Sequence, residues 1–387
     1  MSARRWRPAR PPLRVWVWTA AAVAVAVVAT LLWRGSDAAA TTSTTAVAAA
    51  PVTGTPAGTV TPAWSAAGEA LPGALVVRGR VVVGSAHGLR ALDVLTGGTA
   101  WTYERANARL CGLAVADDRA VAVFDVPHET RRCDQAVALD VDTGVRAWTR
   151  NVNFSPDVAL LGVDRSPQAA ASIVAWNPTG LVDLDPVGDN IRWRYHAPDG
   201  CRISEVTPGS AGIALVQRCG TDAPQLRLVE PIGGGVRWTK ALAPGAAPQV
   251  AGTDGAVTLT DGATLDVLST DDGSPRAALP LPAAATDASE VFASGVAVVS
   301  AGGAVTGLDP RTGAQVWQVP AVGAAGTVAP DGTDVVVPEN GALVVRDAAT
   351  GTERGRSTVT GLPAGGIAEA AGPVVVLASP GRVVGYR

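Results

Sequence analysis

Short apolar runs alternate with turns along most of this chain. In residues 74–94, ALVVRGRVVVGSAHGLRALDV, Val-, Leu- and Ala-rich runs are separated by turns that contain Gly. This pattern is typical of antiparallel β-strands joined by hairpins. It predicts that residues 74–94 form the first three strands, A, B and C, of a four-stranded antiparallel unit. A motif with Asp, then Gly and Trp, follows strand C and leads into strand D.

The motif recurs at a regular spacing. Its first two copies are ALDVLTGGTAW at 91–101 and ALDVDTGVRAW at 138–148. Steps of 38 to 47 residues separate the positions equivalent to the motif Asp, which is the length of one propeller blade. We predict an all-β propeller of eight blades, with seven as the alternative. The equivalent positions are Asp93, Asp140, Asp185, Glu230, Ser269, Asp309, Asp347 and Arg387.

Each position of the motif has a structural explanation. The Asp carboxylate is expected to accept hydrogen bonds from the turn amides, and the Gly four residues later to adopt the positive φ that a bulged hairpin requires. The Trp falls on strand D, where a large ring fills the gap between radially arranged sheets. We predict this packing role for Trp64, Trp101, Trp148, Trp193, Trp238 and Trp317.

Trp64 lacks a preceding motif, and the last repeat, which ends at Arg387, lacks a strand D. The two fragments complete each other. We predict that a strand around Trp64 pairs with the C-terminal strand and closes the ring, which removes two exposed sheet edges.

The N-terminus has a different character. Residues 15–33 contain no charge, and a helix of this length spans about 28 Å, enough to cross a membrane. The preceding tail, 1–14, contains five Arg and no acid, so we expect it to remain in the cytoplasm and the rest of the chain to lie outside. A cleavable secretory signal is the alternative, because 37–40, DAAA, offers small residues at a cleavage site.

Residues 34–61 are rich in Ala, Thr and Pro and cannot form a core of their own, so we predict a flexible linker. The domain that follows, 62–387, is the predicted propeller. Outside residues 1–34 the chain has 25 basic and 34 acidic residues, and the basic residues are scattered. Nucleic acid is therefore not an expected partner.

The Ala-x-Asp-x-x-Thr-Gly-x-x-x-Trp pattern over residues 62–387 resembles the repeat of the quinoprotein alcohol dehydrogenase-like superfamily, the PQQ-binding-like β-propellers. The same repeat builds PQQ-dependent dehydrogenases and a non-enzymatic lipoprotein of outer-membrane protein assembly. Dehydrogenases of the alcohol type carry two adjacent cysteines over the quinone, an Asp base and Ca²⁺ ligands. This chain has no Cys-Cys pair, and no Asp matches the base. We therefore expect no PQQ, no other cofactor and no catalytic residue.

Other candidate chemistry is weak. The histidines, His87, His128 and His196, lack the spacing of metal ligands, and we interpret them as loop residues. The segments 140–144 and 269–275 lack the periodic acids of a calcium loop. We therefore expect no metal site.

The four cysteines fall at one end of two blades. Cys111 and Cys201 lie near the start of strand A, while Cys133 and Cys219 lie near the connection from strand B to strand C. Since the start of A neighbours the end of B, we predict the disulfides Cys111–Cys133 and Cys201–Cys219, in a compartment where disulfides persist.

Long B–C connections in these two blades, 125–134 and 218–224, are candidate partner-binding loops, with Arg131 and Arg132 as candidate contact residues. A neutral insertion is the alternative. The predicted function is a membrane-anchored extracytoplasmic scaffold that binds an envelope protein during cell-envelope assembly. The alternatives are a PQQ-dependent oxidoreductase and a sensor that binds a small ligand in the central channel.

Overall fold

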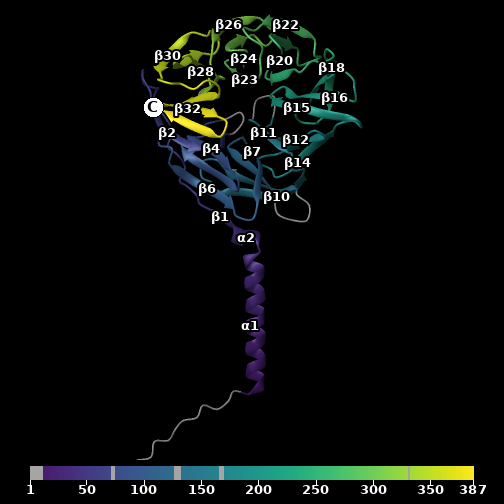
Figure 1. Ribbon diagram of the computed structural model, residues 1–387, viewed down its shortest axis with the longest axis vertical. Helices are drawn as coiled ribbons and strands as arrows, with labels where there is room; N and C mark the ends of the chain where they lie inside the picture. The colour runs from purple at the N-terminus through teal and green to yellow at the C-terminus, as the bar shows by residue number, and fades with distance from the viewer. Residues whose placement is uncertain (1–11, 71–74, 126–131, 165–169, 330–331) are drawn as a thin grey trace, which may run out of the picture.

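The repeats form radial antiparallel sheets arranged in a ring, and one helix extends from the rim (Figure 1). The computed structural model describes residues 12–70, 75–125, 132–164, 170–329 and 332–387. Within these residues there are eight four-stranded blades, which confirms the predicted count. Strand A of each blade lies nearest the central channel and strand D lies outermost.

Blades 1 to 4 each use consecutive strands. Their bounds are β3 (Glu69–Ala70), β4 (Arg80–Ser85), β5 (Gly88–Asp93) and β6 (Thr99–Arg105) in blade 1; β7 (Arg109–Ala116), β8 (Arg119–Asp125), β9 (Cys133–Asp140) and β10 (Arg146–Phe154) in blade 2; β11 (Ala159–Val163), β12 (Ser172–Asn177), β13 (Gly180–Leu184) and β14 (Ile191–His196) in blade 3; and β15 (Cys201–Gly209), β16 (Gly212–Cys219), β17 (Gln225–Val229) and β18 (Val236–Ala241) in blade 4.

Blades 5 to 7 follow the same order, and blade 8 takes its strand D from the other end of the chain. The bounds are β19 (Gln249–Gly252), β20 (Val257–Asp261), β21 (Thr264–Leu268) and β22 (Pro275–Pro280) in blade 5; β23 (Ala288–Ala293), β24 (Val296–Ala301), β25 (Ala304–Leu308) and β26 (Gln315–Pro320) in blade 6; β27 (Gly326–Ala329), β28 (Asp334–Glu339), β29 (Ala342–Asp347) and β30 (Glu353–Thr358) in blade 7; and β31 (Ile367–Ala371), β32 (Val374–Ser379), β33 (Arg382–Tyr386) and β2 (Pro62–Ala67) in blade 8.

The ring closes as predicted. β2 pairs antiparallel with β33, with Trp64 opposite Gly385. A second link holds the inner strands of blades 7 and 8, because β27 pairs in parallel with β31. The hydrophobic core consists of clusters between neighbouring blades, formed mainly by Val, Leu, Ile and Ala.

The helix α1 (Leu13–Arg34) contains the apolar run predicted at 15–33. It buries none of its residues against the rest of the chain, and its length and composition allow it to cross a membrane.

Residues 35–60 are attached to the propeller, unlike the flexible linker that the sequence predicts for 34–61. A short helix, α2 (Asp37–Ala40), leads into β1 (Thr41–Ser43), which pairs with β6 as a fifth strand of blade 1. The chain then continues to blade 7, where Thr358 N–H donates to Gly58 O. Small polar residues cannot build a core, but their backbone groups can bond to a sheet edge that already exists.

Candidate functional site

The two faces of the ring differ in how uniform their loops are. The lower face is defined here by the A–B and C–D turns, and the upper face by the B–C hairpins and the starts of strands A. The repeat motif lies on the lower face.

The motif Trp residues join neighbouring blades at the lower face. Trp101 is fully buried, and its Nε1 donates to Val141 O of the next blade at 2.8 Å. The same kind of bond, to a C–D turn carbonyl one blade on, is made by Trp64, Trp148, Trp193, Trp238 and Trp317.

The motif Gly is the surface on which this Trp rests. A Cβ on Gly144 would lie 2.6 Å from Cγ of Trp101, closer than any real contact. Gly144 also has φ +73°, so the turn requires glycine for both reasons. Strand D of blade 5 carries Ala277 at the position of the motif Trp. Ala277 rests against Gly313.

The motif Asp caps the turn, as the sequence predicts. Oδ1 of Asp140 accepts from Thr143 N at 3.0 Å and from the Thr143 hydroxyl at 2.9 Å. Burial alone would raise the pKa of Asp140, but these bonds and the charge of Arg119 together lower it. The carboxylate is thus held ionised in a structural role.

The upper face carries two long hairpins. The B–C connection is two residues long in six of the blades, but it runs from 126 to 132 in blade 2 and from 220 to 224 in blade 4. The four cysteines lie at these two hairpins, with Cys111 and Cys133, and Cys201 and Cys219, at disulfide distance. These are the pairs that the sequence predicts. Each loop is short enough that a disulfide contributes about 3 kcal/mol.

Arginines surround these hairpins. Arg202 and Arg218 are directly opposite each other on β15 and β16, beside the Cys201–Cys219 pair, and both are exposed. Arg218 makes only long contacts, at 3.4 and 3.5 Å, to two carbonyl oxygens. Within the described chain, the Arg202 guanidinium has no ion-pair partner. Like charges at directly opposite positions do not stabilise a sheet, so the pair contributes positive charge to the upper face rather than a stabilising contact.

The candidate residues of blade 2 are only partly described. Arg132 is exposed, and its Nη1 donates to Asn153 Oδ1 at 2.6 Å. Arg131 and His128 lie outside the described residues. Arg202 and Arg218 each directly adjoin a cysteine of the predicted disulfide, but neither is among the predicted contact residues.

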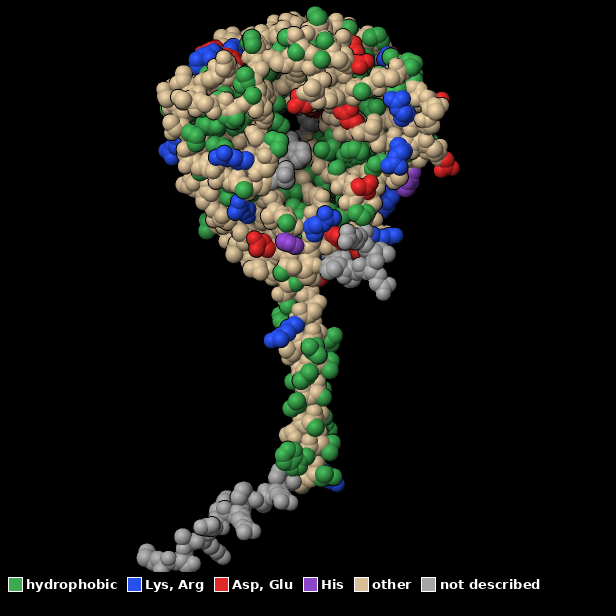
Figure 2. All heavy atoms as spheres, viewed as in Figure 1, with side chains coloured by type: hydrophobic (Ala, Val, Ile, Leu, Met, Phe, Trp, Pro, Cys, Tyr) green, Lys and Arg blue, Asp and Glu red, His purple; other side chains and the backbone are tan. Residues whose placement is uncertain are grey.

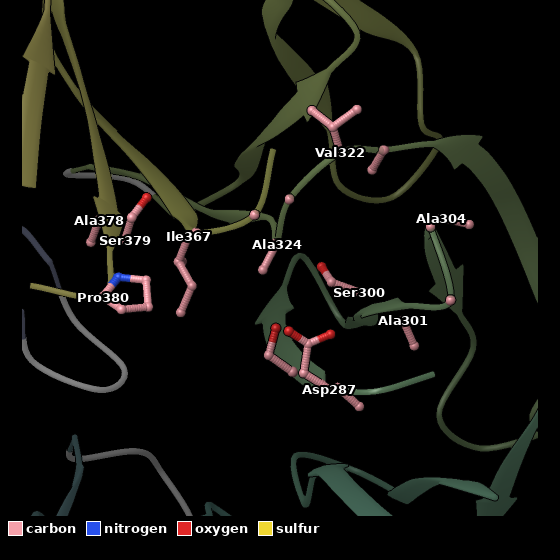
Figure 3. A pocket seen from close by; sticks show the side chains of 18 of the residues that line it. Asp287, Ser300, Ala301, Ala304, Val322, Ala324, Ile367, Ala378, Ser379 and Pro380 are labelled. Carbon is pink, nitrogen blue, oxygen red and sulfur yellow. The ribbon is translucent and has the colours of Figure 1, made fainter. Parts of the chain in front are cut away.

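A cavity of about 480 Å³ lies at the upper ends of blades 6, 7 and 8. Figure 3 shows Asp287, Ser300, Ala324, Ile367 and Pro380 around it. Small residues and Gly make up most of its wall. The cavity can accept an apolar side chain or a small ligand, and no local pattern predicts it, because its wall combines Leu75 with residues of blades 6, 7 and 8.

Acidic side chains lie beside the opening of the central channel, while many Arg side chains lie farther out on the ring (Figure 2).

Three glutamates on strands A accept hydrogen bonds from backbone N–H groups of a neighbouring blade or its connection. Val250 N–H donates to Glu205, Asp254 N–H to Glu290 and Leu75 N–H to Glu369. Burial raises the pKa of Glu205 and Glu369 to about 7 and, with repulsion from Asp254, that of Glu290 to about 8.

Metal-binding geometry is not found in the described ranges: no three His, Cys, Asp or Glu side chains there group around a common point. His87 Nδ1 lies 2.7 Å from Ala108 O, within the connection between blades 1 and 2. His196 ends β14 at the upper face.

The comparisons with known proteins agree with the fold. The family model described as outer membrane protein assembly factor BamB matches residues 222–384. BamB from Moraxella catarrhalis is 16% identical with a TM-score of 0.51, covering 85% of this chain and 99% of that one. Sqt1 of Chaetomium thermophilum, bound to the N-terminus of ribosomal protein L10, is 12% identical with a TM-score of 0.53, covering 84% and 95%.

A quinohemoprotein alcohol dehydrogenase from Comamonas testosteroni is 14% identical with a TM-score of 0.50, covering 85% of this chain and 76% of that one. No match to the sequence is found among curated proteins. The similar structures include an assembly factor, a protein bound to the N-terminus of a ribosomal protein and an alcohol dehydrogenase, so the fold does not decide the activity. Residues 222–384 are thus similar to the BamB family model, and the described chain as a whole folds as an eight-bladed β-propeller.

Proposed function

We propose that this protein is a membrane-anchored, extracytoplasmic scaffold that binds a protein partner at its upper face. The observation that carries the proposal is the coincidence of three features in blades 2 and 4: the two long B–C connections, the two disulfides and the exposed arginines. Binding loops are commonly held on a rigid scaffold in this way.

The charge of the upper face specifies the kind of partner. Arg202 and Arg218 place two like charges at opposite strand positions, and a carboxylate bound beside them can accept hydrogen bonds from both. The partner is therefore a protein segment that carries Asp or Glu. The lower face is a poorer candidate, because its turns are occupied by the Trp and Asp contacts and residues 44–49 cross its blade 2 turn.

The proposed cellular position is supported by α1 and the disulfides. An apolar helix after an arginine-rich tail supports a single span with the tail in the cytoplasm. Disulfides persist outside the cytoplasm, which supports a propeller on that side. BamB is described as an assembly factor, and Sqt1 is seen with a bound protein N-terminus; both support a role in protein binding for a propeller of this shape.

Replacing Arg202 and Arg218 with Ser is expected to reduce the yield of partner crosslinked to the full chain in intact cells at least tenfold. The reason is the loss of two charge-assisted hydrogen bonds to the partner carboxylate. The matched control is Arg311→Ser, which removes an arginine with 91% of its side chain exposed from a lower-face turn of blade 6. An unchanged crosslinking pattern in the double variant, measured by mass spectrometry, would contradict the proposal.

The oxidoreductase alternative rests on the likeness to the alcohol dehydrogenase. We expect that the purified protein neither binds PQQ tightly nor reduces a dye with alcohols or sugars when Ca²⁺ is present, because no adjacent cysteine pair can cover a quinone. Absorbance and dye-linked turnover after reconstitution measure this. A stoichiometric chromophore with substrate-dependent dye reduction would replace the scaffold proposal by an enzyme.

A further inference from the structure

We propose that residues 35–60 hold the rim of blades 1 and 2 against the membrane surface, so that the ring stands on its edge and its channel runs parallel to the bilayer. The partner of this rim is the layer of lipid headgroups. The inference rests on the proposed membrane anchor, since it concerns how the propeller is oriented once α1 is in the bilayer.

The connection between the helix and the propeller is short. α1 ends at Arg34, and α2, which is already docked on the propeller, begins at Asp37. Gly35 and Ser36 alone lie between them. Three residue steps span at most about 11 Å even when fully extended, so Asp37 cannot lie far from the end of the helix.

An ion pair between a buried arginine and a half-exposed aspartate fastens α2 to blade 1. Oδ1 of Asp37 lies 2.8 Å from Nη2 of Arg105, whose side chain is only 2% exposed. Asn107 Nδ2 donates to the same oxygen at 2.9 Å, and Arg105 also donates to Gln135 of blade 2. The Arg105 guanidinium lies over the Phe124 ring, 5.6 Å from its centroid. Removing Asp37 takes away the carboxylate that faces the buried Arg105 guanidinium, so the contact favours the docked position of α2.

The residues after α2 extend this attachment around the lower face. β1 continues the sheet of blade 1, Ala46 N–H donates to Thr143 O of blade 2, and Ala49 N–H donates to Asp142 Oδ1. Val52 lies against the A–B turn glycines of blades 1 and 8, Gly79 and Gly372. Attachment at four blades, including blade 7 through Gly58, prevents the segment from swinging as a unit.

The length of α1 sets the height of the propeller. Its 22 residues span about 33 Å, slightly more than the roughly 30 Å of a bilayer's hydrocarbon core. Arg34 therefore reaches the headgroup layer, and the rim that holds Asp37 lies within about 11 Å of it. In Figure 1 the ring is seen face-on and α1 leaves the rim beside α2 and β1, in the plane of the ring.

The same contacts bear on signal cleavage. A cut after Ala40 would remove Asp37 and leave the Arg105 guanidinium buried without its carboxylate. The folded propeller thus uses a residue of the predicted cleavage region, which favours a retained anchor over a cleaved signal.

Two variants, each with one added cysteine outside the two disulfides, test the orientation in the full chain. Ala106→Cys lies in the connection between blades 1 and 2, where its N–H bonds to Ala40 O, and Ala284→Cys lies in the equivalent connection between blades 5 and 6, across the ring. Both positions are exposed. Each variant is labelled with a fluorophore and reconstituted into phosphatidylcholine and phosphatidylglycerol vesicles that contain a headgroup-nitroxide lipid.

We expect the label at position 106 to be quenched at least threefold more than the label at 284. Inserting ten Gly and Ser residues between Gly35 and Ser36 should abolish the difference, because the insertion frees the rim from the helix without altering the docked residues. Equal quenching at both positions in protein that floats with the vesicles would overturn the orientation alone. A mature N-terminus at Thr41, or failure to float, would instead overturn the proposed anchor and the orientation with it.

Discussion

Replacing Trp101 with Ala is expected to lower the free energy of unfolding by about 3 to 5 kcal/mol. The indole is fully buried between blades 1 and 2, and its Nε1 bonds to Val141 O at 2.8 Å. The substitution leaves a cavity above Gly144, and it leaves a carbonyl of the turn without its donor. Urea denaturation of the detergent-solubilised chain, followed by circular dichroism, measures the change.

Trp33→Ala provides the control, because Trp33 lies on α1 with 63% of its surface exposed and makes no contact with a blade turn. Its effect on unfolding of the propeller should be within about 0.5 kcal/mol. A loss of less than 1 kcal/mol in the Trp101 variant would show that the Trp-to-Gly contacts do not hold the blades together.

The sequence predicted the ring well because each blade repeats the same local physics. A turn that needs Gly144 at positive φ and a strand that places Trp148 four residues later can be recognised without knowing any distant contact. Closure was also predictable, since Trp64 lacked a motif and the chain end lacked a strand, and the structure pairs them.

Contacts between distant, non-repeated residues could not be predicted in this way. Asp37 and Arg105 are far apart in sequence and have no shared motif. Composition is then the remaining guide to segment 34–61, and it predicts a linker. The run 74–77 was predicted as strand A of blade 1, but that strand is Glu69–Ala70. Leu75 is buried in the core, and its N–H bonds to the Glu369 carboxylate rather than to a strand.

The stability of the propeller is expected to depend on pH. We expect the propeller to lose stability as the pH rises from about 5 to 8.5, because the glutamates that bond across blades must then be charged inside the protein. Glu290 is the strongest case. Burial and the nearby Asp254 raise its pKa to about 8, although Thr258 and the Asp254 N–H donate hydrogen bonds to it.

The sign of the change in stability with pH follows from proton binding. In the unfolded chain a glutamate releases its proton near pH 4.5, whereas in the folded protein Glu290 keeps its proton up to about pH 8. The folded state therefore binds more protons between these values, and its stability is full below about 4.5 and falls as the pH rises through 8. The turn aspartates act in another window: hydrogen bonds from Arg354 and Thr350 lower the pKa of Asp347, so its contribution is lost only in acid.

Glu290→Gln should remove most of this dependence. Gln cannot ionise, and its carbonyl can still accept from Asp254 N–H, so the variant should be more stable than the wild type at pH 8.5 by on the order of 3 kcal/mol and nearly equal to it at pH 5. Thermal unfolding at pH 5, 7 and 8.5 tests this, with Glu230→Gln as the control because Glu230 is exposed on a lower-face turn. If the variant and the wild type lose stability in parallel as the pH rises, Glu290 is not the residue that makes the blade 5 and 6 contact sensitive to pH.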